Sequence, residues 1–193
     1  MITPDVQLRQ SGLELTGPGV KLSAYGPHWL HDSPLLEDFT PEEADIVGAG
    51  MLGARARPGQ VLVAEGQVGD WMLLVLAGTV DVTRRLPQDG GVARLAVIRA
   101  GAAVGEMSML DGEPRYASCT AIEAVEFAVL TRAAVARLIH DHPAIGAKLL
   151  VKITQVLAQR LRNTTQQLTR LLDERAGRTG VQAAPQTAAT QAL

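Results

Sequence analysis

A glycine, a carboxylate and an arginine lie close together in residues 104–118, where they could hold a sugar phosphate. Gly105 can adopt backbone angles closed to other residues, so the chain can turn there and open a short helix whose first amide groups attract phosphate. Glu106 follows the turn with a carboxylate suited to accept hydrogen bonds from sugar hydroxyls. Arg115 adds a planar fork of donors that matches phosphate oxygens. The segment therefore predicts a binding site for a ribose phosphate.

Two runs in this segment, Gly105–Leu110 and Pro114–Ala117, resemble the phosphate-binding cassette of cyclic nucleotide-binding domains, the family of the bacterial catabolite activator protein and of the regulatory subunits of cyclic-AMP-dependent kinase. The resemblance implies that Glu106 binds the ribose 2′-hydroxyl and that Arg115 pairs with the cyclic phosphate. It also covers the glycine-punctuated runs Arg57–Gly66 and Leu74–Val80. The remaining ligand-binding residues that we expect from the cassette are Gly105, Met107, Ser108, Tyr116 and Ala117.

The sequence departs from the family pattern at two positions. Val104 stands before the glycine where the family usually has Phe, and it should fill the same core position. Tyr116 follows the arginine where most relatives have a small residue linked to discrimination between adenine and guanine. An aromatic ring there could stack on a purine or block it. We expect cAMP to be favoured over cGMP, with no other cofactor.

Another interpretation of the cassette needs no ligand. Glu106 and Arg115 could form a surface ion pair, which contributes about 0 to 1 kcal/mol. In that case the chain would keep the fold as a ligand-free interaction module, and Tyr116 is the residue that best favours this alternative.

Residues 143–175 read as one long helix with apolar and threonine positions spaced alternately four and three apart, which is a heptad seam. The seam favours a parallel homodimer, although a single helix packed on its own domain would also carry an apolar face. The seam positions are Leu150, Thr154, Leu157, Leu161, Thr164, Leu168 and Leu171.

The stretch Arg160–Thr165 resembles the part of the catabolite activator protein in which adjacent Thr and Ser contact adenine across the dimer seam. The resemblance makes Thr164 and Thr165 candidate ligands of the base. Alternatively, Thr164 only fixes the register of the seam. If the ligand contacts both the cassette and these hydroxyls, binding would tie together two parts of the chain that otherwise move separately.

The remaining sequence predicts an α+β fold, an antiparallel β-roll (a jelly-roll-like barrel) flanked by helices and completed by the long C-terminal helix. Thr40–Glu43 forms a capping box that opens a helix to about Leu52, and Thr131 caps a helix that buries Val135, Leu138 and Ile139. Between them, apolar runs alternate with glycine turns, which is typical of short strands. The run Trp71–Val82, which contains a glycine turn at Gly78, should cross the middle of the roll, and Ser118–Leu130 reads as one strand.

We therefore expect four parts. Residues 1–33, rich in Gly and Pro, would be an irregular leader, and 34–142 the nucleotide-binding roll. Residues 143–175 would be the long helix, and 176–193 a disordered tail.

Composition narrows the class of protein. The 193 residues are 47% hydrophobic, enough for one good core. The single cysteine, Cys119, excludes an internal disulfide, and His140–His142 reads as a helix-ending turn more than as a metal site. No apolar run approaches the ~20 residues of a membrane span, and no signal peptide is recognisable. We expect a cytoplasmic protein without a membrane partner, and no enzyme, because no nucleophile–base pair or metal cluster is evident.

The process that the chain controls after it binds a nucleotide is harder to predict from the sequence. Activators of this family carry a helix-turn-helix domain after the long helix, whereas about twenty residues follow Leu172 here, so we expect no direct DNA-binding domain. The net charge of -2 also argues against general nucleic-acid binding. The favoured hypothesis is a cyclic nucleotide receptor that signals to an unknown protein effector through its C-terminal helix. The alternative is a Crp/Fnr-type transcriptional regulator that acts with a DNA-binding partner.

Overall fold

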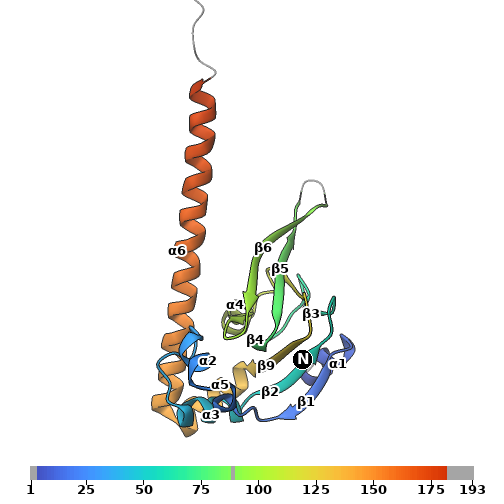
Figure 1. Ribbon diagram of the computed structural model, residues 1–193, viewed down its shortest axis with the longest axis vertical. Helices are drawn as coiled ribbons and strands as arrows, with labels where there is room; N and C mark the ends of the chain where they lie inside the picture. The colour runs from blue at the N-terminus through green and yellow to red at the C-terminus, as the bar shows by residue number, and fades with distance from the viewer. Residues whose placement is uncertain (1–3, 88–89, 182–193) are drawn as a thin grey trace, which may run out of the picture. The chain divides into compact units, whose positions relative to one another are not determined.

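The computed structural model describes the backbone of residues 4–87 and 90–181 and the side chains of residues 5–87 and 90–174 (Figure 1). The chain divides into two compact units, Met1–Ile153 and Thr154–Leu193. The first unit holds both β-sheets and the shorter helices, and the second contains the long C-terminal helix from Thr154 to Val181.

Two antiparallel sheets form the first unit, and together they confirm the predicted β-roll flanked by helices. Each sheet is open, so the strands do not close into the expected barrel. The five-stranded sheet has the order β1 (Glu14–Pro18), β2 (Leu52–Ala56), β9 (Val125–Thr131), β4 (Trp71–Ala77) and β7 (Ala103–Val104). The four-stranded sheet has the order β3 (Val61–Val63), β8 (Ser118–Ala121), β5 (Thr79–Arg85) and β6 (Val92–Arg99).

The core lies where the inward faces of both sheets meet, and two long apolar runs are divided between the sheets there. The run Trp71–Val82 splits at Gly78, which has φ 87° and would place a Cβ atom 2.4 Å from the carbonyl oxygen of Ala124. The run Ser118–Leu130 likewise splits into β8 and β9, which belong to different sheets. Both splits let one continuous apolar stretch contribute to two sheets.

The N-terminal segment is ordered, and the prediction of an irregular leader is wrong from residue 4 onward. It forms α1 (Pro4–Gln10), β1, a 3-10 turn η1 (Leu22–Tyr25) and α2 (Pro27–Asp32). Its glycines and prolines stand mostly between or at the ends of these elements, while buried leucines lie in α1, η1 and α2 and directly before β1. These leucines, all at most 4% exposed, are Leu8, Leu13, Leu22 and Leu30.

The capping signals in the sequence are confirmed. In α3 (Pro41–Ala49) the Glu43 amide donates to Thr40 Oγ1 at 3.2 Å, and the Thr40 amide donates to Glu43 Oε2 at 3.0 Å. In α5 (Arg132–Asp141) the Ala134 amide donates to Thr131 Oγ1 at 2.9 Å. Ile139 is 38% exposed, so its predicted burial is wrong.

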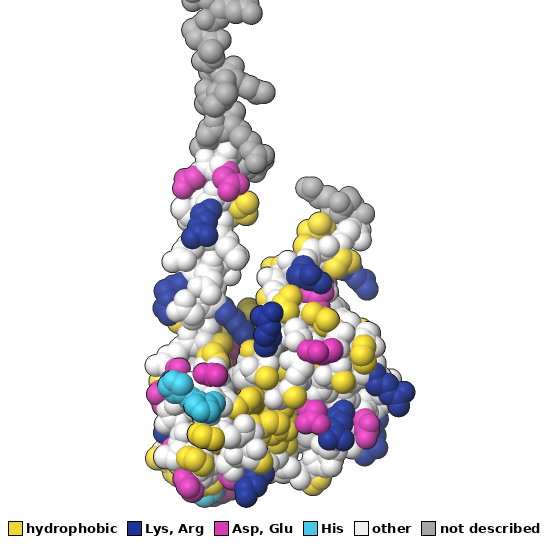
Figure 2. Space-filling view, viewed as in Figure 1, with side chains coloured by type: hydrophobic (Ala, Val, Ile, Leu, Met, Phe, Trp, Pro, Cys, Tyr) yellow, Lys and Arg dark blue, Asp and Glu magenta, His cyan; other side chains and the backbone are white. Residues whose placement is uncertain are grey.

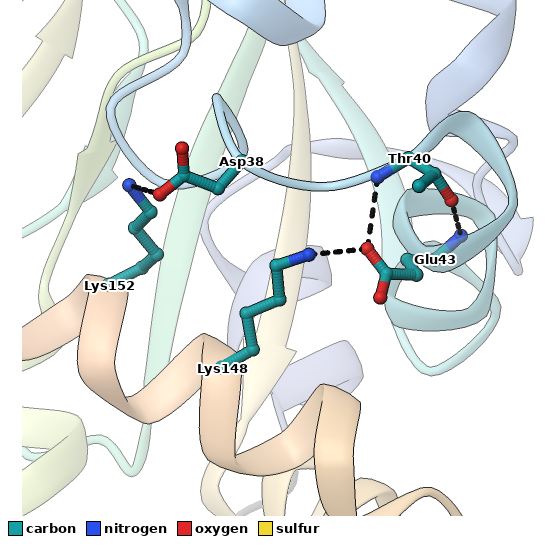
Figure 3. A network of polar contacts seen from close by, with 5 residues as sticks. All are labelled: Asp38, Thr40, Glu43, Lys148 and Lys152. Atoms are coloured by element: carbon teal, nitrogen blue, oxygen red, sulfur yellow. Dashed lines mark hydrogen bonds and ion pairs between the residues drawn. The ribbon is translucent and has the colours of Figure 1, made fainter.

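The long helix α6 (Pro143–Val181) begins after the predicted break at His142. Its first turns are tied to the segment before α3 and to α3 itself by two lysines (Figure 3). Lys148 Nζ lies 2.6 Å from Glu43 Oε2, and Lys152, 5% exposed at its side chain, pairs with Asp38 and with Glu37 Oε1 at 2.8 Å. Because the helix continues to Val181, the predicted tail is wrong for 176–181, and 182–193 lie outside the described residues.

Candidate functional site

The short helix α4 (Glu106–Asp111) is held at both ends. Its N-cap Gly105 and C-cap Gly112 are left-handed, with φ 89° and 83°. At the C-terminal end Arg132 of α5 donates from Nε to the carbonyl oxygen of Met109 at 2.5 Å and from Nη2 to that of Ser108 at 3.3 Å. A cation that satisfies the last carbonyls stabilises the C-terminal end of a helix of this length.

Arg115 is positioned by its backbone as well as by its side chain. Its amide donates to the carbonyl oxygen of Gln67 at 2.9 Å, and its own carbonyl accepts from the Gly66 amide at 2.8 Å. The side chain is 3% exposed, and Nη1 donates to the Gly105 carbonyl oxygen at 2.9 Å. Arg115 therefore joins the turn before α4, through its guanidinium, to the loop before β4, through its backbone.

Two glycines and an indole ring surround the guanidinium. Arg115 Cζ lies 4.3 Å from the centroid of the Trp71 ring, within the range of a cation–π contact. A Cβ atom at Gly69 would lie 2.9 Å from Arg115 Nη2, and one at Gly105 would lie 2.6 Å from Nη1. Side chains at these two positions would fill the space of the guanidinium, which explains why glycine suits both.

The charge of Arg115 is incompletely satisfied. Among the described residues, Nε and Nη2 are buried and have no hydrogen-bond partner. Burial lowers the pKa of Arg115 from its ordinary value, while Cys119, Asp70 and Glu106 act in the opposite direction. A guanidinium stays protonated even so. Since buried donors and charges normally have partners, this arrangement suits an anionic ligand.

Glu106 lies at the first position of α4 and is 2% exposed. Its negative charge is one of those that act on the Arg115 guanidinium. The structure thus brings Gly105, Glu106 and Arg115 together, as the sequence predicts. Of the other expected cassette residues, Ser108 is 4% exposed, Met107 is 52% exposed, and Ala117 packs against the core cluster.

Tyr116 lies on the surface with an unexpected neighbour. Its ring is 56% exposed, and Arg84 Cζ on β5 lies 3.6 Å from the ring centroid. Arg84 Nε is in turn 3.9 Å from Glu65 Oε1. The Arg84 guanidinium therefore lies over one face of the ring, while more than half of the residue remains exposed.

Sequence reasoning missed three residues of this site: Arg84, Trp71 and Gly69. Their separation from the cassette is too large for any spacing rule to connect them. One signal was available: Gly69 stands two residues before Trp71, the first residue of the buried strand β4. A glycine at that position permits close approach of another group to the ring.

Thr164 and Thr165 belong to the second unit. Both are exposed, and each donates its hydroxyl to its own helix, Thr164 to the Arg160 carbonyl oxygen at 2.9 Å and Thr165 to that of Leu161 at 2.8 Å. The hydroxyl oxygens keep their acceptor capacity.

Other surface features lie away from the cassette. Two hollows of about 280 Å³ each adjoin the ion pair of Arg55 with Glu126, and neither is lined by cassette residues. Acidic and basic side chains are interspersed on the visible face of the roll (Figure 2). The buried charge of Arg115, and not cavity volume, marks the candidate site.

The described residues contain neither a metal-binding cluster nor a membrane-spanning helix. Within residues 4–87 and 90–181, no group of three or more His, Cys, Asp or Glu side chains could hold a metal ion. Over the same ranges, no helix combines the length and the apolar character needed to cross a bilayer.

Comparisons with known proteins point to one family. A family model described as Cyclic nucleotide-binding domain matches residues 54–142. The crystal structure of a cyclic nucleotide-binding domain from Methylobacillus flagellatus is 34% identical, with a TM-score of 0.71, and the match covers 82% of this chain and 88% of that one.

Two curated relatives are longer proteins. A CRP-like cAMP-activated global transcriptional regulator of Mycobacterium tuberculosis is 36% identical over 114 residues, which are 59% of this chain and 49% of the relative. A cyclic AMP receptor protein of Thermus thermophilus is 33% identical over 148 residues, covering 76% of this chain and 66% of the relative. The chain spans about half the length of the first and about two thirds of the second.

Proposed function

Because the chain belongs to the cyclic nucleotide-binding domain family, we propose that it is a cytoplasmic receptor for a cyclic nucleotide, with cAMP favoured over cGMP. The observation that carries this proposal is the Arg115 guanidinium, which is 3% exposed and has two nitrogen atoms without an acceptor among the described residues. An exocyclic phosphate oxygen would supply that acceptor, and each charge-assisted hydrogen bond would contribute about 1.5 to 3 kcal/mol.

The ribose is assigned to Glu106. A buried carboxylate accepts hydrogen bonds and donates none, so it suits the 2′-hydroxyl of the sugar. The turn at Gly105 places this carboxylate at the start of α4, next to the carbonyl that holds Arg115 Nη1. Phosphate and sugar would thus be bound from one loop, with Ser108 and the α4 backbone close by. The carboxylate would bind a hydroxyl and would not act as a general base.

The base is assigned to Tyr116. Arg84 Cζ lies 3.6 Å from the ring centroid, and 56% of the residue is exposed. Stacking of a base on an aromatic ring contributes about 1 to 3 kcal/mol and does not depend on which purine is present. Tyr116 would therefore add affinity for either purine. The preference for cAMP over cGMP would depend on polar contacts to the base, which Thr164 and Thr165 would make.

The chain would transmit its ligand-bound state to an effector through a homodimer formed along α6. Three seam leucines in the part of α6 after Thr154 are exposed in the single chain: Leu161 is 70% exposed, Leu168 55% and Leu171 58%. A second copy of the chain would cover this seam, and a protein effector would bind the paired helices differently with and without the nucleotide. Coupling of this kind is typically about 1 to 3 kcal/mol.

A second candidate rests on the Mycobacterium tuberculosis relative, whose name is that of a transcriptional regulator. The chain would then act on transcription together with a DNA-binding partner. A mobility shift of promoter DNA that requires both the chain and cAMP would favour this candidate over signalling to a non-DNA-binding effector.

Titration calorimetry with cAMP, cGMP and a cyclic dinucleotide tests the proposed function. We expect cAMP to bind more tightly than cGMP, and the cyclic dinucleotide to bind weakly or not at all. Failure of all three to bind would leave only the fold, which is the outcome that a ligand-free interaction module predicts.

A further inference from the structure

The side-chain amide of Gln7, in the N-terminal helix α1, bridges two parts of the roll. Its Oε1 accepts from Trp71 Nε1 at 2.8 Å, and its Nε2 donates to the Val68 carbonyl oxygen at 3.0 Å. These partners are 64 and 61 residues away along the chain. A single side chain thus uses both ends of its amide to fix an indole ring and a loop.

Both partners of Gln7 adjoin Arg115. Trp71 carries the guanidinium over its ring at 4.3 Å, and Val68 is next to Gly69, whose missing Cβ makes room for Arg115 Nη2. The carbonyl of Gln67, in the same loop, accepts from the Arg115 amide at 2.9 Å. The ring and the loop that define the position of the guanidinium are therefore the same groups that Gln7 holds.

Helix α1 is itself anchored independently of Gln7. Leu8 is 1% exposed and belongs to the core cluster, and the Leu13 amide closes the end of the helix on the Leu8 carbonyl oxygen at 3.0 Å. Since Leu8 supplies the apolar anchor, the Gln7 amide is not required to dock the helix. Its two hydrogen bonds act instead on the groups around Arg115.

We propose that Gln7 is a positioning residue of the phosphate site, and that α1 forms part of the receptor by holding Trp71 and residues 66–70 against the Arg115 guanidinium. The effect on nucleotide affinity rests on the proposed function, because cAMP is the ligand whose binding would respond. The effect on the geometry around Trp71 does not depend on any ligand.

The test compares Gln7→Met with Gln10→Met. Methionine has nearly the length of glutamine but cannot make the two hydrogen bonds, and Gln10 is an exposed residue of the same helix. Calorimetry with cAMP should give about tenfold weaker binding for Gln7→Met, since each lost hydrogen bond changes an equilibrium by a few-fold to tenfold. Gln10→Met should bind as the wild type does. Equal affinities of the two variants would overturn the proposal.

A second measurement separates positioning from general stability and needs no nucleotide. In a Trp29→Phe background, Trp71 gives the single indole N–H resonance in a nitrogen–proton NMR spectrum. Gln7→Met should shift this resonance and speed hydrogen exchange at the amides of Gly66 and Arg115, whereas Gln10→Met should do neither. If the wild type binds no cyclic nucleotide, the proposed function fails, but this comparison still decides whether Gln7 positions Trp71 and the loop. An unchanged indole resonance and unchanged amide exchange in Gln7→Met would overturn the positioning role of Gln7.

Discussion

Gly105 and Arg115 share one small volume: a Cβ atom at position 105 would lie 2.6 Å from Arg115 Nη1. Gly112, at the other end of α4, has nearly the same left-handed backbone, but its Cβ would lie 3.5 Å from the nearest atom, Arg132 Nη2. The two glycines therefore differ in what surrounds them and hardly in conformation. This difference allows backbone strain to be separated from displacement of the guanidinium.

The first prediction compares Gly105→Ala with Gly112→Ala. Both variants should lose about 1 to 2 kcal/mol of stability, because alanine is strained in the left-handed region. Only Gly105→Ala should also push the guanidinium from its place and weaken cAMP binding at least tenfold. Thermal unfolding and calorimetry on both proteins provide the check. Equal loss of binding in the two variants would contradict a specific role for the space beside Gly105.

The second prediction concerns Tyr116. Tyr116→Ala should weaken cAMP binding by about 1 to 3 kcal/mol, because a stacking surface is lost. Tyr116→Phe should bind like wild type, since the ring face remains, and Arg84→Ala should have a smaller effect, about 0.5 to 1 kcal/mol, through loss of the cation–π contact. Calorimetry on the three variants checks this. Tighter binding by Tyr116→Ala would mean that the ring obstructs the nucleotide.

The third prediction concerns pH and the start of α6. Hydrogen bonds from Lys148 and from the Thr40 amide lower the pKa of Glu43 below its ordinary value of 4.5. A depressed carboxyl pKa stabilises the fold at pH above 4.5, and this contribution is lost as the pH falls through the folded-state value.

Glu43→Gln keeps a capping amide but loses the ion pair, so it should reduce stability at pH 7 by about 0 to 1 kcal/mol. The difference from wild type should shrink as the pH falls below 4.5 and through the lowered pKa of Glu43. Glu42→Gln removes a neighbouring charge and serves as the control. Urea unfolding between pH 3 and 7 measures both; a pH-independent difference for Glu43→Gln would contradict the assignment.

The fourth prediction addresses the α6 seam. Wild type should sediment as a dimer, and Leu168→Glu, which places a charge on the seam, should sediment as a monomer. Gln166→Glu adds the same charge two residues away, off the seam, and should leave the dimer intact. Analytical ultracentrifugation distinguishes these cases. A monomeric wild type, or a Leu168→Glu variant that remains dimeric, would contradict signalling through a homodimer formed along the α6 seam.

Local signals in the sequence predicted much of this fold. The capping box of Thr40 and Glu43, the cap at Thr131 and the break at His142 were found because each depends on residues within a few positions of one another. The proximity of Glu106 and Arg115 was predicted because the cassette is nearly continuous in the chain.

The features that were missed depend on distant contacts. The order of the leader follows from isolated leucines such as Leu8 and Leu22, whose burial no periodic pattern announces. The glycine pattern predicted the turn at Gly78, but the close approach of Ala124, 46 residues later, could not be predicted from it. Gln7, Trp71 and Arg84 reach the site only through the folding of the roll, so sequence spacing could not connect them to Arg115.

The central claim is that Arg115 holds the phosphate of a cyclic nucleotide, and calorimetric titration of cAMP into Arg115→Ala tests it most directly. Circular dichroism should first show that the variant keeps the wild-type fold. Binding should then be abolished, and Arg115→Lys should be nearly as harmful, because an ammonium group cannot reproduce the guanidinium fork. Wild-type affinity in a folded Arg115→Ala would contradict the account.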